Sequence, residues 1–217
     1  MKALLTLFLV FVPLTLLAHG VDASDQAVLD AGGLLAYIWV GAKHMVTGYD
    51  HLLFLAGVIF YLKGYRDILL FITVFTIGHS ITLTGATYLG IRADEHLVDA
   101  VIALSVCYKG FENLGGFGSK SPNLLAMVFL FGLIHGFGLS TRLQSFDIGA
   151  DGFLAKILCF NLGVELGQVA ALIPIVFLIR QWQGHKTYES FYKAANTYLV
   201  VAGVALFVYQ VYGYITS

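Results

Sequence analysis

The chain alternates between long runs of apolar residues and short breaks that contain glycine or charged residues. A helix that crosses a bilayer needs about 20 mostly apolar residues, because each residue adds about 1.5 Å along the helix axis. Runs that reach or approach this length predict six membrane-spanning helices, which cover residues 48–62, 67–89, 97–114, 124–139, 153–179 and 195–215. We therefore expect an all-α integral membrane protein, built as a bundle of six transmembrane helices.

Two apolar stretches before the first predicted span are too short to cross a bilayer by themselves. Residues 1–18 have the pattern of a secretory signal peptide, with Ala18 before the expected cut; an uncleaved first helix is the alternative. Cleavage there would leave residues 19–217 as a single helical transmembrane domain, in which His19 could chelate a metal through its free amine and its imidazole. Residues 33–42 either extend the first span or form an interfacial segment.

Composition supports a membrane protein and argues against several other classes. Of the 217 residues, 59% are hydrophobic and 12% are charged, whereas a soluble domain has about 25% charged residues. The net charge of −1 provides no basic surface for nucleic acid. No nucleotide-binding motif indicates ATP hydrolysis, and we do not expect an enzyme. Cys107 and Cys159 fall in predicted spans, where we interpret them as small core residues rather than a disulfide or soft metal ligands.

Positive charges favour one orientation in the membrane. Lysine and arginine are enriched in cytoplasmic loops, and in this chain they follow the first, third and fifth predicted spans. These residues are Lys63, Arg66, Lys109, Lys120, Arg180, Lys186 and Lys193. The pattern places the protein in the bacterial inner (cytoplasmic) membrane with both termini in the periplasm, and a secretory signal would place the N-terminus on the same side.

Ionisable residues inside the apolar runs are the strongest functional signal. A charged side chain at the centre of a membrane helix costs about 2.5–3.5 kcal/mol on insertion scales, so such residues usually face the bundle interior and mark an ion or substrate path. The first group is His44, Asp50 and His51. In a continuous helix His44 and His51 share a face, and two imidazoles with a carboxylate suit nickel, zinc or copper. The alternative is a helix start at which Asp50 interacts with the helix dipole.

Two further histidines lie near the middle of predicted spans. His79 belongs to a polar stripe with Thr76, and His135 is flanked by Gly132 and Gly136, which permit close helix approach. The two segments form a weak repeat, with a phenylalanine four positions before each histidine and parallel directions in the predicted topology. Each histidine either ligates a metal or bonds to a neighbouring helix.

Carboxylates and amides form two more groups. The fifth span carries three polar residues at helical spacing, Asn161, Glu165 and Gln168. A glutamate at this depth would be protonated or paired with histidine or metal; a structural hydrogen-bond network is the alternative. Glu112 and Asn113 lie near the cytoplasmic end of the third span. They are candidate exit ligands, unless Glu112 forms an ordinary helical pair with Lys109.

These motifs resemble those of the HupE/UreJ family of membrane proteins. The similarity rests on the segments HMVTGYDHLLFL, FTIGHSITL, IALSVCYKGFEN, FGLIHGFGL and FNLGVELGQ. The resemblance implies a metal-handling membrane fold and uptake of nickel, or a related divalent metal, for hydrogenase and urease maturation. The family's metal-associated signature, a histidine followed after five residues by Asp-His, falls on His44, Asp50 and His51. Hydrogenase-linked members carry two histidines in a later segment, of which this chain has only His135.

The leading hypothesis is a secondary permease for a divalent transition metal ion, with nickel as the first choice and zinc, copper or cobalt as alternatives. The expected ligands and supporting residues, from periplasm to cytoplasm, are His44, Asp50, His51, His79, His135, Glu165, Asn161, Gln168, Glu112 and Asn113. Metal binding to neutral imidazole and ionised carboxylate releases protons, so transport coupled to protons is part of the hypothesis.

Two other classes remain as alternatives. A sensor or a metal-delivery protein would use the same ligands without a continuous path. An intramembrane enzyme or haem protein would use His79 and His135 to hold a cofactor. The expected partners are the metal ion and the lipid bilayer, and a homo-oligomer is left open.

Overall fold

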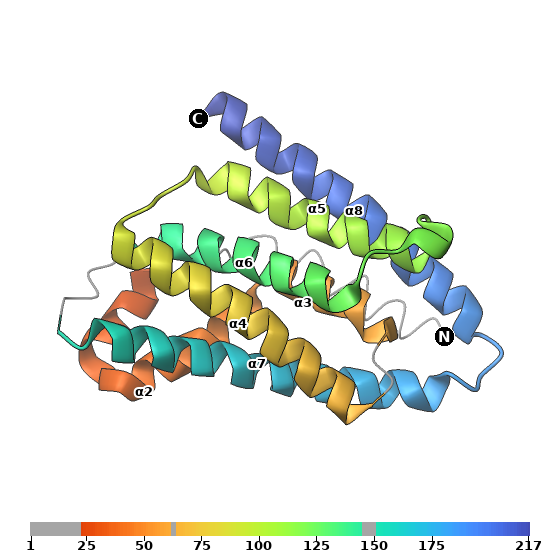
Figure 1. The fold of residues 1–217 in the computed structure, drawn as a ribbon, viewed down its shortest axis with the longest axis horizontal. Coiled ribbons are helices and arrows are strands. Elements are labelled where there is room, and N and C mark those ends of the chain that lie inside the picture. The colour runs from red at the N-terminus through yellow and green to blue at the C-terminus, as the bar shows by residue number, and fades with distance from the viewer. Residues whose placement is uncertain (1–22, 62–63, 145–150) are drawn as a thin grey trace.

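The computed structural model describes residues 23–61, 64–144 and 151–217, and these residues form a helical bundle (Figure 1). Their seven α-helices are α2 (Ala23–Thr47), α3 (Tyr49–Val58), α4 (Tyr65–Leu89), α5 (Glu95–Asn113), α6 (Leu124–Leu143), α7 (Phe153–Trp182) and α8 (Tyr188–Thr216). Two short 3-10 helices, η1 (Ile59–Tyr61) and η2 (Gly118–Lys120), complete the described elements. The all-α prediction is confirmed, whereas the predicted signal peptide and His19 lie outside the described residues.

Four helices of the described part are long and apolar enough to cross a membrane, namely α4, α6, α7 and α8. Large apolar side chains are exposed on their outer faces, among them Leu69, Ile77, Leu166 and Val204. Lipid is the solvent that such faces require. The structure therefore supports a multi-pass membrane protein, although helix length and apolar character identify only four of the six predicted spans in the described part of the chain.

The other two predicted spans fall short for physical reasons. Helix α5 has 19 residues, but Asp99, Lys109 and Glu112 interrupt its apolar sequence. The first predicted span, residues 48–62, is too short by itself, because α2 ends at Thr47, Gly48 adopts an extended conformation (φ −70°, ψ 103°), and the span then holds only the 10-residue α3 and the short η1. His44 and His51 therefore lie on two separate helices, and the shared face expected for a continuous helix does not apply to them.

Helix α2 folds back on itself at Gly33. The Asp25 carboxylate lies 2.7 Å from the Lys43 ammonium, although 18 residues of straight helix would separate them by about 27 Å. Gly33 makes the bend with φ 58° and ψ −155°, a conformation open only to glycine. The second half of α2 contains residues 33–42 and leads directly to the break before α3.

Three helix pairs build the bundle, and glycines allow the close approach in each. Helix α4 packs along α6, α5 along α8 and α2 along α7. A Cβ on Gly78 would lie 2.5 Å from the Phe129 carbonyl oxygen, and a Cβ on Gly110 would lie 2.7 Å from the Asn196 carbonyl oxygen. Only backbone-to-backbone packing leaves so little space.

Helices α4 and α6 run in the same direction. Gly132 meets the backbone of Phe75, and Gly136 meets the backbone of His79 one turn further along both helices. The segments of the weak sequence repeat therefore lie side by side, and His79 comes to the same level as His135.

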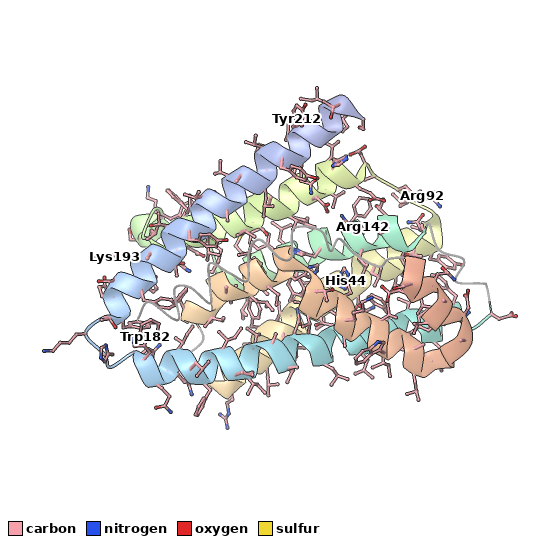
Figure 2. All side chains as sticks on the ribbon, turned by 180° about the vertical axis from the view of Figure 1, so that it is seen from behind. His44, Arg92, Arg142, Trp182, Lys193 and Tyr212 are labelled. Carbon is pink, nitrogen blue, oxygen red and sulfur yellow. The ribbon has the colours of Figure 1, made fainter. Side chains whose placement is uncertain are left out.

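Charged residues mark the two ends of the bundle. Arg92 and Arg142 lie at one end, and Lys193 lies at the other, near the aromatic Trp182 (Figure 2). Lys109, interpreted above as a loop charge, is instead buried inside the bundle at 2% exposure. It therefore contributes nothing to the loop-charge argument.

Candidate metal site

Four histidines from four helices meet inside the bundle. His44 comes from α2, His51 from α3, His79 from α4 and His135 from α6, and none is more than 4% exposed. The ring centroids of His44 and His51 are 5.0 Å apart, and those of His51 and His135 are 4.9 Å apart. His79 joins the same neighbourhood as His135 through Phe75, which packs against both rings. Figure 2 shows His44 on the inner side of α2.

Local backbone features bring these rings together. The break at Gly48 separates His44 from His51, and both side chains still reach the interior, where their rings make an edge contact. On the other side of the cluster, Phe75 packs against the rings of both His79 and His135, with centroid distances of 6.1 and 5.3 Å. Phenylalanine thus forms an apolar wall beside the imidazoles.

Hydrogen bonds fix the orientation of two of the rings. The Nδ1–H of His135 donates to the Phe131 carbonyl oxygen at 2.7 Å, and Nδ1 of His79 lies 3.0 Å from Oδ1 of Asn161, to which it donates. In both rings Nε2 then carries the lone pair. A metal-ligating histidine typically donates its other N–H to a carbonyl or carboxylate in this way.

The polar stripe of α7 faces α4. Asn161 accepts the bond from His79, and Gln168 accepts one from the Thr76 hydroxyl at 3.3 Å. Glu165 lies between the two amides along α7; its side chain is half-buried and makes no hydrogen bond or ion pair with the described residues. The structure therefore places Asn161 at the histidine cluster, with Gln168 and Glu165 further along the same stripe.

Several buried polar atoms of this region have no hydrogen-bond partner among the described residues. They are Nε2 of His79, Nδ2 of Asn161 and Nε2 of Gln168. Buried polar groups are bonded in the great majority of cases, and exceptions require an explanation such as water or an ion. An Nε2 lone pair on a buried, oriented imidazole suits a transition metal, whereas the two amide N–H groups suit water or another acceptor.

The ring spacing is compatible with a shared metal ion. Two imidazoles on one tetrahedral metal, with metal–nitrogen bonds of about 2.0–2.1 Å, place their ring centroids about 5 Å apart. In the described part of the chain, however, no group of three His, Cys, Asp or Glu side chains has the geometry of a formed metal site. The Asp50 side chain lies outside the described side chains. Ion binding by three of the described side chains therefore requires side-chain rotation.

Glu112 and Asn113 do not join the histidine cluster. They belong to a second buried polar group, together with Lys109 on the same helix and Asn196 on α8. The predicted helical pair is present, because the Lys109 ammonium lies 2.5 Å from a Glu112 carboxylate oxygen.

The sequence analysis missed a polar network between α5, α6 and α8. Asp99 accepts hydrogen bonds from Arg142 and, at 3.2 Å, from Gln210, whose side-chain oxygen lies 2.7 Å from His96. The sequence did contain a signal, since Asp99 stands alone in the apolar stretch VDAVIALSV.

Comparison with protein families gives one match. The family described as HupE / UreJ protein matches residues 23–217, which include every described element. Comparisons with curated proteins and with solved structures gave no significant match.

Proposed function

The chain belongs to the HupE/UreJ family, and from this premise we propose that it is a permease that moves a divalent transition metal ion, with nickel as the first choice, across the bacterial inner membrane. Family membership indicates a metal-related membrane protein. The observation that carries the finer proposal is the meeting of four buried histidines from four helices. Ionisable groups inside a membrane bundle are costly, and where they occur they usually mark an ion or substrate path.

In the proposed route the ion first meets the break between α2 and α3. His44, His51 and the intervening Asp50 provide the capturing ligands there. The ion then passes to His79 and His135, whose rings are oriented by hydrogen bonds through Nδ1. The stripe of Asn161, Glu165 and Gln168 on α7 supplies supporting oxygen atoms, and the exit lies past Glu112 and Asn113.

Proton coupling follows from the ligand types. Imidazole binds a metal only when neutral, so protons compete with the ion for each histidine and are released when the ion binds. This coupling is part of the proposal.

We also propose that six segments cross the membrane. The second half of α2 together with α3 would form one span, and α5 another. The charges of α5 meet partners inside the bundle, Asp99 with Arg142 and Lys109 with Glu112, which lowers the cost of placing them in lipid. We place the end with Lys193 in the cytoplasm and the end with Arg92, where the C-terminal end of α8 also lies, in the periplasm (Figures 1 and 2). The N-terminus lies outside the described residues, and the proposal assigns it to the periplasm as well.

Uptake into proteoliposomes tests this function. Purified protein would be reconstituted, and accumulation of Ni²⁺, Co²⁺, Zn²⁺ and Cu²⁺ would be compared for wild type, His79→Ala and His185→Ala. His185 is exposed and bonds locally to Thr187, so its replacement is the matched control. We expect His79→Ala to abolish uptake and His185→Ala to preserve it.

Two results would contradict the proposal. Equal uptake by wild type and His79→Ala would remove the histidine cluster from the path. Tight metal binding by wild type without accumulation of any of the four ions would instead favour a sensor or a metal-delivery protein.

A further inference from the structure

Lys109 and Glu112 form an ion pair in the interior of the bundle. The Lys109 ammonium lies 2.5 Å from the Glu112 carboxylate, and the two side chains are 2% and 3% exposed. Buried ions carry a desolvation penalty of several kcal/mol each, which a single contact rarely repays. Such a pair is therefore poor evidence for stability and invites a functional explanation.

The pair itself does not connect two helices. Lys109 and Glu112 are three positions apart on α5, so their attraction acts within one helix. Neutral groups make the connections between helices at this level instead. The Asn113 amide donates to the Gly57 carbonyl oxygen on α3 at 2.7 Å and to the Asn196 side chain on α8 at 2.5 Å.

The neighbouring helix leaves room for the lysine. A Cβ on Gly57 would lie 2.8 Å from Cγ of Lys109, so any larger residue at position 57 would collide with the lysine stem. The amide oxygen of Asn113 is buried and has no hydrogen-bond partner among the described residues. The Glu112 carboxylate is thus paired with a lysine that fits closely against α3, and the next residue in the chain carries a buried acceptor oxygen.

Helix α3 connects this pair to the histidine cluster. His51 lies at the start of α3, and Gly57 lies six residues later, about 9 Å along the axis. Between them Phe54 packs against Phe131 and His135, with centroid distances of 5.2 and 5.6 Å. An ion that leaves the histidines and passes this phenylalanine would next meet the Glu112 carboxylate.

We propose that Lys109 is a built-in cation that occupies the Glu112 carboxylate and keeps a second cation site closed until a metal ion displaces it. The inference rests on the proposed function, because it concerns the exit of the same path. Carboxylate and amide oxygens make the site, with Glu112 and the Asn113 side chain as ligands. The returning ammonium then releases the ion, so Lys109 positions the exit and does not itself bind the metal.

The first test replaces the lysine with an uncharged side chain of similar length. Mn²⁺ is the probe, because it prefers oxygen ligands and its binding is measured by electron paramagnetic resonance. We expect Lys109→Met to bind one more Mn²⁺ ion per chain than wild type. The affinity of the Glu112 site for Mn²⁺ should rise at least about tenfold, because the competing ammonium is gone. The double variant Lys109→Met/Glu112→Gln should lose this ion.

The controls separate this site from the histidines and from charge removal in general. Lys193→Met breaks an exposed pair with Glu189, of 3.1 Å and i,i+4 spacing, and should bind Mn²⁺ as wild type does. His135→Asn should weaken Ni²⁺ binding. When His135→Asn is combined with Lys109→Met, the additional Mn²⁺ ion should still bind. If wild type neither binds nor takes up Ni²⁺ while the Mn²⁺ result holds, this would count against the proposed function alone.

A second measurement applies even if Lys109→Met does not fold. Glu112→Gln keeps the shape of the side chain and removes the charge that attracts the ion. We expect Ni²⁺ uptake by this variant to fall at least about tenfold, with Ni²⁺ affinity at the histidines unchanged. A folded Lys109→Met without additional Mn²⁺, or a Glu112→Gln variant with wild-type uptake, would overturn the inference.

Discussion

The contact between α4 and α6 gives the sharpest prediction, through the substitution Gly78→Ala. A Cβ at this position would lie 2.5 Å from the Phe129 carbonyl oxygen and 3.1 Å from the Leu133 nitrogen. Ordinary contacts begin near 3.4 Å, so the two helices would have to separate by about 1 Å. Overpacking of this kind costs about 1–3 kcal/mol. The shift would also displace the adjacent His79 from its neighbours.

The same substitution at Gly85 provides the matched control. Gly85 lies on the same helix, and a Cβ there would meet nothing within 4 Å. Both changes gain the higher helix propensity of alanine, about 1 kcal/mol in water, so the difference between the two variants isolates the overpacking cost. We therefore expect Gly78→Ala to be less stable than Gly85→Ala by about 1–3 kcal/mol.

Equilibrium unfolding in mixed detergent micelles would measure this difference, and Ni²⁺ titration would measure the effect on the site. We expect weaker Ni²⁺ binding for Gly78→Ala and wild-type binding for Gly85→Ala. Equal stability of the two variants would refute the close backbone packing of α4 and α6. Lower stability with unchanged Ni²⁺ affinity would refute the link from this packing to the metal site.

Three further predictions concern single polar groups. Asn161→Leu removes the acceptor of the His79 Nδ1–H, and we expect Ni²⁺ affinity to fall about 10–100-fold in calorimetric titration. An affinity equal to that of wild type would show that this hydrogen bond does not support metal binding. Asn113→Leu leaves the Gly57 carbonyl without its side-chain donor, and should lower the free energy of unfolding by about 1–3 kcal/mol; a stability change near zero would contradict this. Arg142→Met leaves Asp99 without its cation and should lower the free energy of unfolding by up to about 3 kcal/mol; a stability change near zero would count against the ion pair.

The helical class and most helix positions could be predicted from the pattern of apolar runs. The sequence places a span at residues 124–139, and α6 covers Leu124–Leu143. The fold-back of α2 could not be predicted this way, because it depends on the φ of Gly33 and on the contact between Asp25 and Lys43 across 18 residues. Neither property leaves a periodic signal.

The sequence predicted only part of how the candidate residues are grouped in space. Spacing within a helix predicts which residues share a face, as for Asn161 and Gln168, but it does not indicate which helices are neighbours. The break between His44 and His51 could not be predicted, because Gly48 is one of 24 glycines and the sequence does not distinguish it from the others. Lys109 was misread as a loop charge because a buried lysine and a loop lysine have the same sequence signal near a span end.

The most direct test of the central claim is an X-ray absorption spectrum of the protein loaded with one equivalent of Zn²⁺. If histidines from separate helices bind one ion, the spectrum should show imidazole scattering from at least two rings, with metal–nitrogen distances of about 2.0–2.1 Å. This scattering should decrease in His135→Asn and persist in His185→Ala. Coordination by oxygen alone, or an unchanged spectrum in His135→Asn, would contradict the account.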